Sequence, residues 1–224
     1  LFSYAHKGAL GPDSSFEEIQ LFFDEVLHSA DSFALMQAEV QKKYPRFEKK
    51  NKSTHLVTKE VSYLHIIENL LQKDKELRLL GIIRNPLATL ASWVQAPKEF
   101  DPEWNLINEW YYAPSKNQGK REEYYGYEKW KSAAIDFLKY RDQYPSRFKL
   151  VNYKILNEKT LEVVKELFDF YELDIPQQTI NFINESKTRH ELDPYSVYRS
   201  NANDDQWNAI LPDEVVEYIV GDLK

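Results

Sequence analysis

A basic residue and a hydroxyl flank a predicted junction between a strand and a helix. Residues 79–83 form an apolar run of strand length, Arg84 follows it directly, and Pro86 suits a first helical turn because it has no N–H. Ser92 comes eight positions after Arg84, nearly two turns up that helix. A guanidinium, a hydroxyl and helix N-terminal N–H groups are donors that bind phosphate. The junction therefore predicts a phosphate site; the alternative is that Arg84 simply pairs with a carboxylate.

The neighbouring patterns predict the elements that hold this junction. Strand patterns at 55–58, 79–83 and 148–152 alternate with helical patterns, which indicates a parallel sheet with helices on both faces. The run at 79–83 is typical of a strand buried on both faces. Because parallel strands share an edge for their carboxyl ends, the residues that follow them are expected to meet there. Besides a helix opened by a capping box at 15–18, the helical patterns cover about 32–43, 61–71, 86–95, 128–144, 160–171, 177–184 and 213–223.

Composition narrows the classes of protein to which the chain can belong. Its 224 residues, 42 % of them apolar, suit one α/β domain, and its net charge of −7 argues against nucleic acid as a partner. The lack of cysteine excludes disulfides, thiolate metal sites and a cysteine nucleophile, and no other cluster has metal-ligand spacing. No apolar stretch approaches the ~20 residues of a membrane span and no signal peptide is visible, so we expect a cytoplasmic protein.

Two irregular segments each have two interpretations. Residues 96–127 are rich in aromatic side chains and prolines, and such excursions are often lids or binding loops. Alternatively, these aromatic residues form a satellite of the core. The charged segment 46–52 is either a solvated loop or a face toward an anionic substrate.

Four features of the chain, taken in order, resemble the sulfotransferases, the family that uses 3′-phosphoadenosine 5′-phosphosulfate as sulfuryl donor. Residues 82–86 with Ser92 resemble the 3′-phosphate motif of that family, including its spacing from arginine to serine. The strand pattern at 148–152, followed by Tyr153 and a helix, resembles the segment whose tyrosine contacts the adenine. The other two features are Lys59, which resembles the lysine ahead of the catalytic region, and Tyr198-Arg199 with Trp207, which resembles a late segment whose arginine binds the 3′-phosphate.

The resemblance implies a single sulfotransferase-like domain over residues 1–224, with a P-loop NTPase-like architecture. It implies that Arg84, Ser92 and Arg199 hold the 3′-phosphate and that Tyr153 contacts the adenine. The reaction implied is transfer of a sulfuryl group to a hydroxyl or amine of a small-molecule or carbohydrate acceptor, without a metal ion.

The sequence departs from the family pattern in two places. The Gly-rich loop that holds the 5′-phosphosulfate is not found, since residues 7–8 and 11–12 follow no buried strand. We expect this loop and its strand to precede Leu1; otherwise the protein is a relative that has lost the reaction. The second departure is Val61, which stands where family members often have a histidine two positions after the lysine.

That second departure leaves the catalytic base to be chosen among other residues. Glu60 lies beside Lys59 at the expected strand end, so we predict that Glu60 is the base and that Lys59 stabilises charge on the transferring group. His65, on the first turns of the following helix, is the alternative base. His55 starts the predicted strand and so lies at its wrong end.

Two other classes of function compete with sulfuryl transfer. A nucleotide or small-molecule kinase would need a Gly-x-x-x-x-Gly-Lys-Ser/Thr loop and an aspartate for magnesium, and these residues show neither. A non-catalytic nucleotide-binding relative would keep only the 3′-phosphate half of the site.

Overall fold

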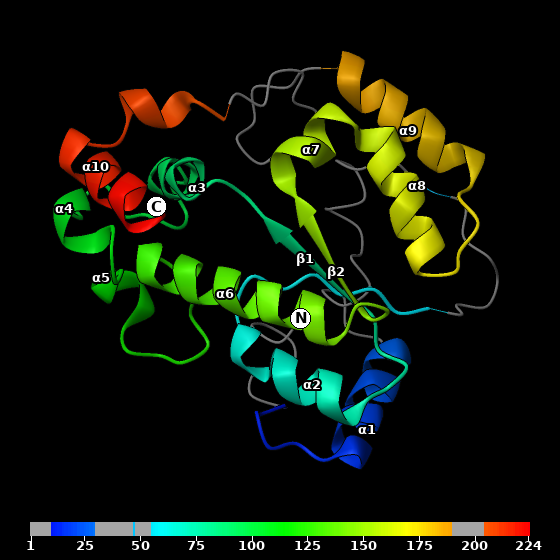
Figure 1. Ribbon diagram of the computed structural model, residues 1–224. Coiled ribbons are helices and arrows are strands. Elements are labelled where there is room, and N and C mark those ends of the chain that lie inside the picture. The colour runs from blue at the N-terminus through cyan, green and yellow to red at the C-terminus, as the bar shows by residue number, and fades with distance from the viewer. Residues whose placement is uncertain (1–9, 30–46, 48–54, 190–203) are drawn as a thin grey trace. The chain divides into compact units, whose positions relative to one another are not determined.

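In the computed structural model, two of the three predicted strands are present and pair with each other (Figure 1). β1 (Leu79–Ile83) and β2 (Phe148–Asn152) are parallel and in register over all five residues. Their carboxyl ends therefore lie at one edge, from which α3 (Pro86–Val94) follows β1 and α7 (Tyr153–Glu158) follows β2. This is the edge at which the sequence predicts a ligand site.

The structure describes residues 10–29, 47, 55–189 and 204–224, which fall into two compact units. The smaller unit contains the described residues up to Leu77 together with 121–124, and the larger unit contains those of 78–120 and 125–224. The predicted helix at 32–43, most of the charged segment 46–52 and Arg199 lie outside the described residues. A single domain over the whole chain stays a prediction.

The helical patterns of the larger unit are confirmed with small shifts at their ends. The largest shift is in α9 (Gln177–Thr188), which ends at Thr188 rather than at 184. The short helices α4 (Leu106–Glu109), α5 (Pro114–Asn117) and α7 are additional. Side-chain caps stabilise two of them, because Asn105 accepts a hydrogen bond from Ile107 N and Asn152 accepts one from Lys154 N. The remaining elements of this unit are α6 (Tyr127–Gln143), α8 (Thr160–Phe170), the 3-10 turn η2 (Gln206–Ala209) and α10 (Asp213–Asp222).

Helices flank both faces of the two-stranded sheet (Figure 1). On one face Phe148 packs against Phe137 of α6, with ring centroids 5.5 Å apart. Successive side chains of a strand point to opposite faces. The next residue, Lys149, accordingly reaches α8, where its Nζ lies 3.3 Å from Glu166 Oε2. The larger unit is thus an α/β structure with a small parallel sheet between helices.

The prediction that 79–83 is buried on both faces is wrong, because one of the five residues is buried, three are half-buried and one is exposed. Gly81 is buried, and a Cβ there would lie 2.8 Å from Phe148 Cζ and 2.9 Å from Phe137 Cδ2. Ile82, on the opposite face, is 48 % exposed. The reason is that β1 has a single described neighbour, β2, so the sheet is too narrow to shield both faces of the strand.

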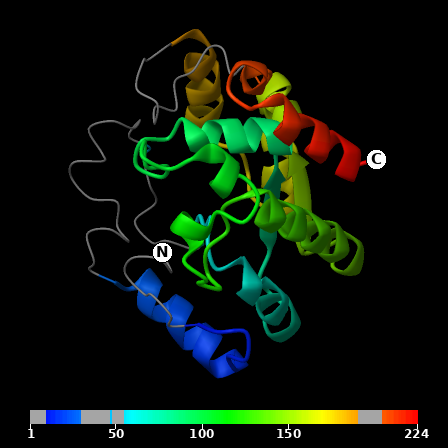
Figure 2. The same ribbon diagram turned by 90° about the vertical axis from the view of Figure 1, so that its left-hand side faces the viewer.

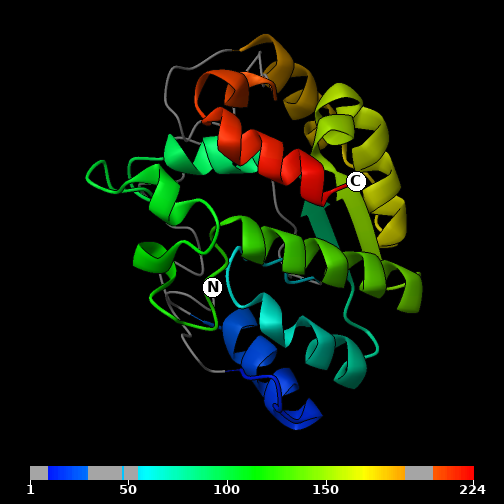
Figure 3. The same ribbon diagram turned by 60° about the vertical axis from the view of Figure 1, so that its left-hand side comes forward.

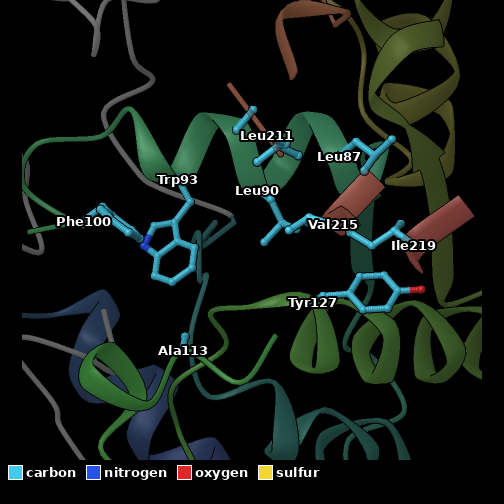
Figure 4. Packing of buried hydrophobic residues seen from close by; sticks show 10 residues of the cluster. Leu87, Leu90, Trp93, Phe100, Ala113, Tyr127, Leu211, Val215 and Ile219 are labelled. Carbon is cyan, nitrogen blue, oxygen red and sulfur yellow. The ribbon is translucent and has the colours of Figure 1, made fainter. Parts of the chain in front are cut away.

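The core of the larger unit lies where α10 packs between α3 and α6 (Figures 2 and 3). Figure 4 shows Val215 and Ile219 of α10 between Leu87 and Leu90 of α3 on one side and Tyr127 of α6 on the other. Val215, Ile219 and Tyr127 have no exposed surface. This core holds α3 in place and, with it, the end of β1.

The smaller unit is built on α1 (Phe16–Leu27) and on α2 (Ile67–Lys73), which the 3-10 turn η1 (Leu64–Ile66) precedes. The predicted capping box is confirmed, since Ser15 Oγ accepts from Glu18 N and Glu18 Oε2 accepts from Ser15 N. The helix predicted over 61–71 is divided between η1 and α2, and it begins after Tyr63, whose φ is 62°. One cluster of buried apolar residues in this unit consists of Leu10, Ile19, Phe22, Val26, Tyr63, Ile66 and Leu70.

The predicted strand at 55–58 is wrong. These residues have no regular secondary structure, and residues 55–59 are exposed. Val57 is 87 % exposed, so the segment has no buried face that would drive it against a sheet.

Candidate functional site

The structure brings Arg84 and Tyr153 together at the carboxyl ends of β1 and β2. Arg84 follows β1, Tyr153 is the first residue of α7 after β2, and Arg84 Cζ lies 4.9 Å from the centroid of the tyrosine ring. A guanidinium over a tyrosine face is a favourable cation–π contact. The backbone at Arg84 is also fixed by a hydrogen bond, because Trp130 Nε1 donates to Arg84 O at 3.0 Å.

Arg84 also has a carboxylate partner. Its Nε and Nη2 both lie 2.8 Å from Asp204 Oδ1, and the Arg84 and Asp204 side chains are 26 % and 19 % exposed. This is the ion pair that the alternative interpretation of Arg84 predicts. Sequence reasoning missed Asp204, because it lies 120 positions further along the chain and belongs to no motif.

The helix that follows Arg84 presents one polar stripe. The side chain of Asn85 caps α3 by accepting from Leu87 N at 2.9 Å, and Pro86 occupies the first helical position. Ser92 is exposed and Thr89, one turn before it, is partly exposed, whereas the residues around them on α3 are buried or half-buried. The Ser92 hydroxyl is therefore accessible to a ligand on the polar side of this helix.

The three residues predicted to take part in the transfer step lie in the smaller unit. Lys59 is exposed and Glu60 is half-buried, and both follow an irregular segment rather than a strand. The expectation that they sit at a strand end is therefore wrong. His65 lies half-buried in η1, with its ring centroid 5.9 Å from that of Tyr63.

The aromatic segment 96–127 forms a satellite of the core, as one of its two interpretations predicts. Trp104, Trp110 and Tyr111 pack against the buried residues of α3, α6 and α10. Its buried polar groups have partners within the segment: Glu109 accepts from Ser115 Oγ at 2.6 Å, and Asn117 Nδ2 donates to Tyr112 O at 2.8 Å.

Ionisable groups next to this core have shifted pKa values. A hydrogen bond with Tyr218, assisted by burial, raises the pKa of Tyr111 to about 12. Burial and a hydrogen bond to Asp222 raise the pKa of Tyr127. Hydrogen bonds from Lys131 and Tyr127 lower the pKa of Asp222. At neutral pH these tyrosines are therefore neutral and Asp222 is charged.

A hollow of about 250 Å³ lies near the first turns of α6. It is lined by Tyr111, Glu128, Lys131, Ser132, Ile135 and Asp136, and none of the predicted site residues is among them.

Within the described parts of the chain, no group of three or more histidine, aspartate or glutamate side chains is arranged to hold a metal ion. Likewise, no helix among the described residues has the length and apolar character needed to cross a membrane.

Comparison with known proteins assigns the family. The family model for the sulfotransferase domain matches residues 6–192, and the chain therefore belongs to this family. The match includes Arg84, Ser92 and Tyr153 and ends before Arg199. No curated protein matches the chain, and no solved structure does. The protein is thus a transferase of the sulfotransferase family, with an α/β fold consistent with the P-loop-like architecture of that family.

Proposed function

We propose that the protein transfers the sulfuryl group of 3′-phosphoadenosine 5′-phosphosulfate to a hydroxyl or amine of a small-molecule or carbohydrate acceptor. The observation that carries the proposal is the stacking of Arg84 on Tyr153, 4.9 Å from Cζ to ring centroid, at the shared carboxyl edge of two parallel strands. This is where open α/β sheets bind ligands, and the two residues stand in segments that resemble two separate motifs of the family.

Arg84 and Tyr153 suit the two ends of a 3′-phosphorylated adenosine. The guanidinium offers several N–H donors in one plane, which match the oxygens of a phosphate. The tyrosine ring has a second face on which an adenine can stack while Arg84 covers the first. Recognition of the 3′-phosphate would distinguish this donor from ATP, which has a free 3′-hydroxyl.

Two further residues complete the proposed donor site. Ser92, exposed on the polar stripe of α3, would donate its hydroxyl to the 3′-phosphate from the side of the helix. Arg199 would bring a second positive charge to the same phosphate. All of these residues act by binding and orienting the donor, and so they contribute to catalysis through positioning.

The transfer step needs a base and a group that stabilises negative charge. The acceptor oxygen or nitrogen forms a bond to sulfur while the bond from sulfur to the bridging oxygen of the 5′-phosphate breaks. The electron pair of the broken bond stays on that oxygen, giving adenosine 3′,5′-bisphosphate, and the acceptor proton goes to the base. We assign the base to Glu60, which is half-buried, with His65 as the alternative, and the charge stabilisation to Lys59. The step as written uses no metal ion.

The test begins with the donor half of the site. Calorimetry with adenosine 3′,5′-bisphosphate and with AMP should show tighter binding of the bisphosphate. Incubation with 3′-phosphoadenosine 5′-phosphosulfate and a panel of phenols, alcohols, amines and sugars should then release bisphosphate only when an acceptor is present. Equal affinity for AMP and the bisphosphate would refute the donor assignment. Phosphoryl transfer from magnesium ATP would favour the kinase, and preferential bisphosphate binding without any transfer would favour a non-catalytic relative.

A further inference from the structure

The guanidinium proposed to bind the donor is already engaged by a carboxylate of the same chain. Asp204 Oδ1 accepts a hydrogen bond from Arg84 Nε at 2.8 Å and forms an ion pair with Nη2 at the same distance. With 26 % of Arg84 and 19 % of Asp204 exposed, the pair is largely shielded from water. Screening by solvent and salt is weaker for such a pair than for a fully exposed one.

The contacts around Arg84 restrict the positions in which a phosphate can bind its guanidinium. The tyrosine ring covers one face of the guanidinium, and Asp204 takes the fork formed by Nε and Nη2. A phosphate that binds two N–H groups at once must therefore take a donor from Asp204 or share Nη2 with it. In either position the negative phosphate would lie close to the negative carboxylate, and like charges this close repel.

We propose that Asp204 is a built-in competitor of the 3′-phosphate and sets the affinity of this site for its nucleotide. Binding of the donor either displaces Asp204 from Arg84 or places the phosphate beside its negative charge, and in both cases Asp204 favours release of the bisphosphate product, which keeps the same 3′-phosphate. This inference rests on the proposed function of Arg84.

The effect of Asp204 on affinity depends on one part of the ligand, the 3′-phosphate. AMP has no 3′-phosphate, so it can bind without disturbing the pair between Arg84 and Asp204. A variant that removes the charge of Asp204 should therefore bind the bisphosphate more tightly and AMP with unchanged affinity. A residue that merely supported the fold, or one that held Arg84 ready for phosphate, would not give this pattern.

The test compares Asp204→Asn with Asp205→Asn, which makes the same change of net charge at the exposed neighbouring position. Asp204→Ser is included because serine also removes the charge but has no amide to take the place of the carboxylate. Affinities for the bisphosphate and for AMP are measured by calorimetry, and stopped-flow displacement gives the rate of bisphosphate release. Circular dichroism checks that each variant is folded.

We expect both Asp204 variants to bind the bisphosphate about tenfold more tightly, with slower release, while their affinity for AMP and the behaviour of Asp205→Asn stay at the wild-type level. Unchanged or weaker bisphosphate binding in the Asp204 variants would overturn the inference, even where the wild type prefers the bisphosphate to AMP. A wild type without that preference would instead refute the proposed function, so the two failures are distinguishable.

Discussion

The end of β1 and the segment 55–60 both place a basic residue after an apolar run, but only the first run is a strand. Leu79–Ile83 pairs with β2 along its whole length, and its Gly81 is covered by Phe148. Residues 55–58 pair with no strand within the described parts of the chain, and Val57 is 87 % exposed. A short apolar run thus becomes a strand where a neighbouring strand and a buried face are available.

This difference has a consequence for the two halves of the proposed reaction. The sheet and the core behind α3 fix the backbone beneath Arg84 and Tyr153. The backbone at Lys59 and Glu60 is irregular, and no strand orients their side chains. We therefore expect donor binding to be sensitive to substitutions that disturb the sheet or the core behind α3. The transfer step should instead be sensitive to substitution of individual side chains around Glu60.

The largest expected effect is on turnover in Glu60→Gln. The amide keeps the shape of the side chain and cannot accept the acceptor proton, so turnover should fall by about 10²–10⁴ with donor binding unchanged. The measurement is the rate of sulfuryl transfer, with bisphosphate affinity measured on the same samples. Glu76→Gln, at an exposed position of the same unit, is the matched control and should behave as the wild type. Near-normal turnover in Glu60→Gln together with a large loss in His65→Ala would transfer the role to His65.

A second pair of variants compares burial in the two regions directly. Ile219 has no exposed surface and packs in the core behind α3, so Ile219→Ala should lower the free energy of unfolding by about 2–5 kcal/mol. Val57→Ala removes apolar surface that is already in water, so it should change the free energy of unfolding by less than about 0.5 kcal/mol. Chemical denaturation measures both. A loss in Val57→Ala as large as that in Ile219→Ala would show that the segment 55–58 is buried after all.

A smaller effect is expected from crowding the sheet at Gly81. A methyl group in Gly81→Ala would lie 2.8 Å from Phe148 Cζ and 2.9 Å from Phe137 Cδ2, so the rings must shift. Overpacking of this kind costs about 1–3 kcal/mol of unfolding free energy. Gly221→Ala is the control for the change of residue type, since a Cβ there meets nothing within 4 Å. Equal stability of the two variants would contradict the packing of α6 on β1 and β2.

The smallest effect concerns the pH dependence of the link between α10 and α6. Lys131 and Tyr127 donate to Asp222, and these hydrogen bonds lower the pKa of its carboxyl in the folded protein. A lowered folded pKa stabilises the fold above the unfolded value of about 4, and this contribution is lost as the pH falls through the folded pKa. Asp222→Asn should therefore be less stable than the wild type at pH 7, and thermal unfolding should show the difference shrinking in acid. A difference that persists unchanged at pH 2 would contradict this origin.

The parts of the fold that could be predicted from the sequence are those governed by local rules. The capping box at Ser15, the proline at the start of α3 and the apolar runs of β1 and β2 each depend on neighbouring residues. The strand predicted at 55–58 failed because its four residues satisfy the local pattern but have no paired strand among the described residues and no buried face.

The candidate site was predictable only where it depends on the ends of the two strands. The pairing of Arg84 with Tyr153 follows from two parallel strands that end at one edge. The carboxylate of Asp204 was not predictable, because a contact across 120 positions depends on tertiary packing and leaves no periodic signal. The aromatic residues of 96–127 likewise allowed two interpretations from the sequence. Their packing around α3, α6 and α10 shows that they form a satellite of the core.

The most direct test of the donor site combines a change in the protein with a change in the ligand. Binding of adenosine 3′,5′-bisphosphate and of AMP is measured by calorimetry for the wild type and for Arg84→Ala. We expect Arg84→Ala to weaken bisphosphate binding by about tenfold to a hundredfold, because charge-assisted hydrogen bonds worth about 1.5–3 kcal/mol are lost, and to leave the affinity for AMP unchanged. An equal loss for both ligands, or no loss for either, would show that Arg84 does not bind the 3′-phosphate.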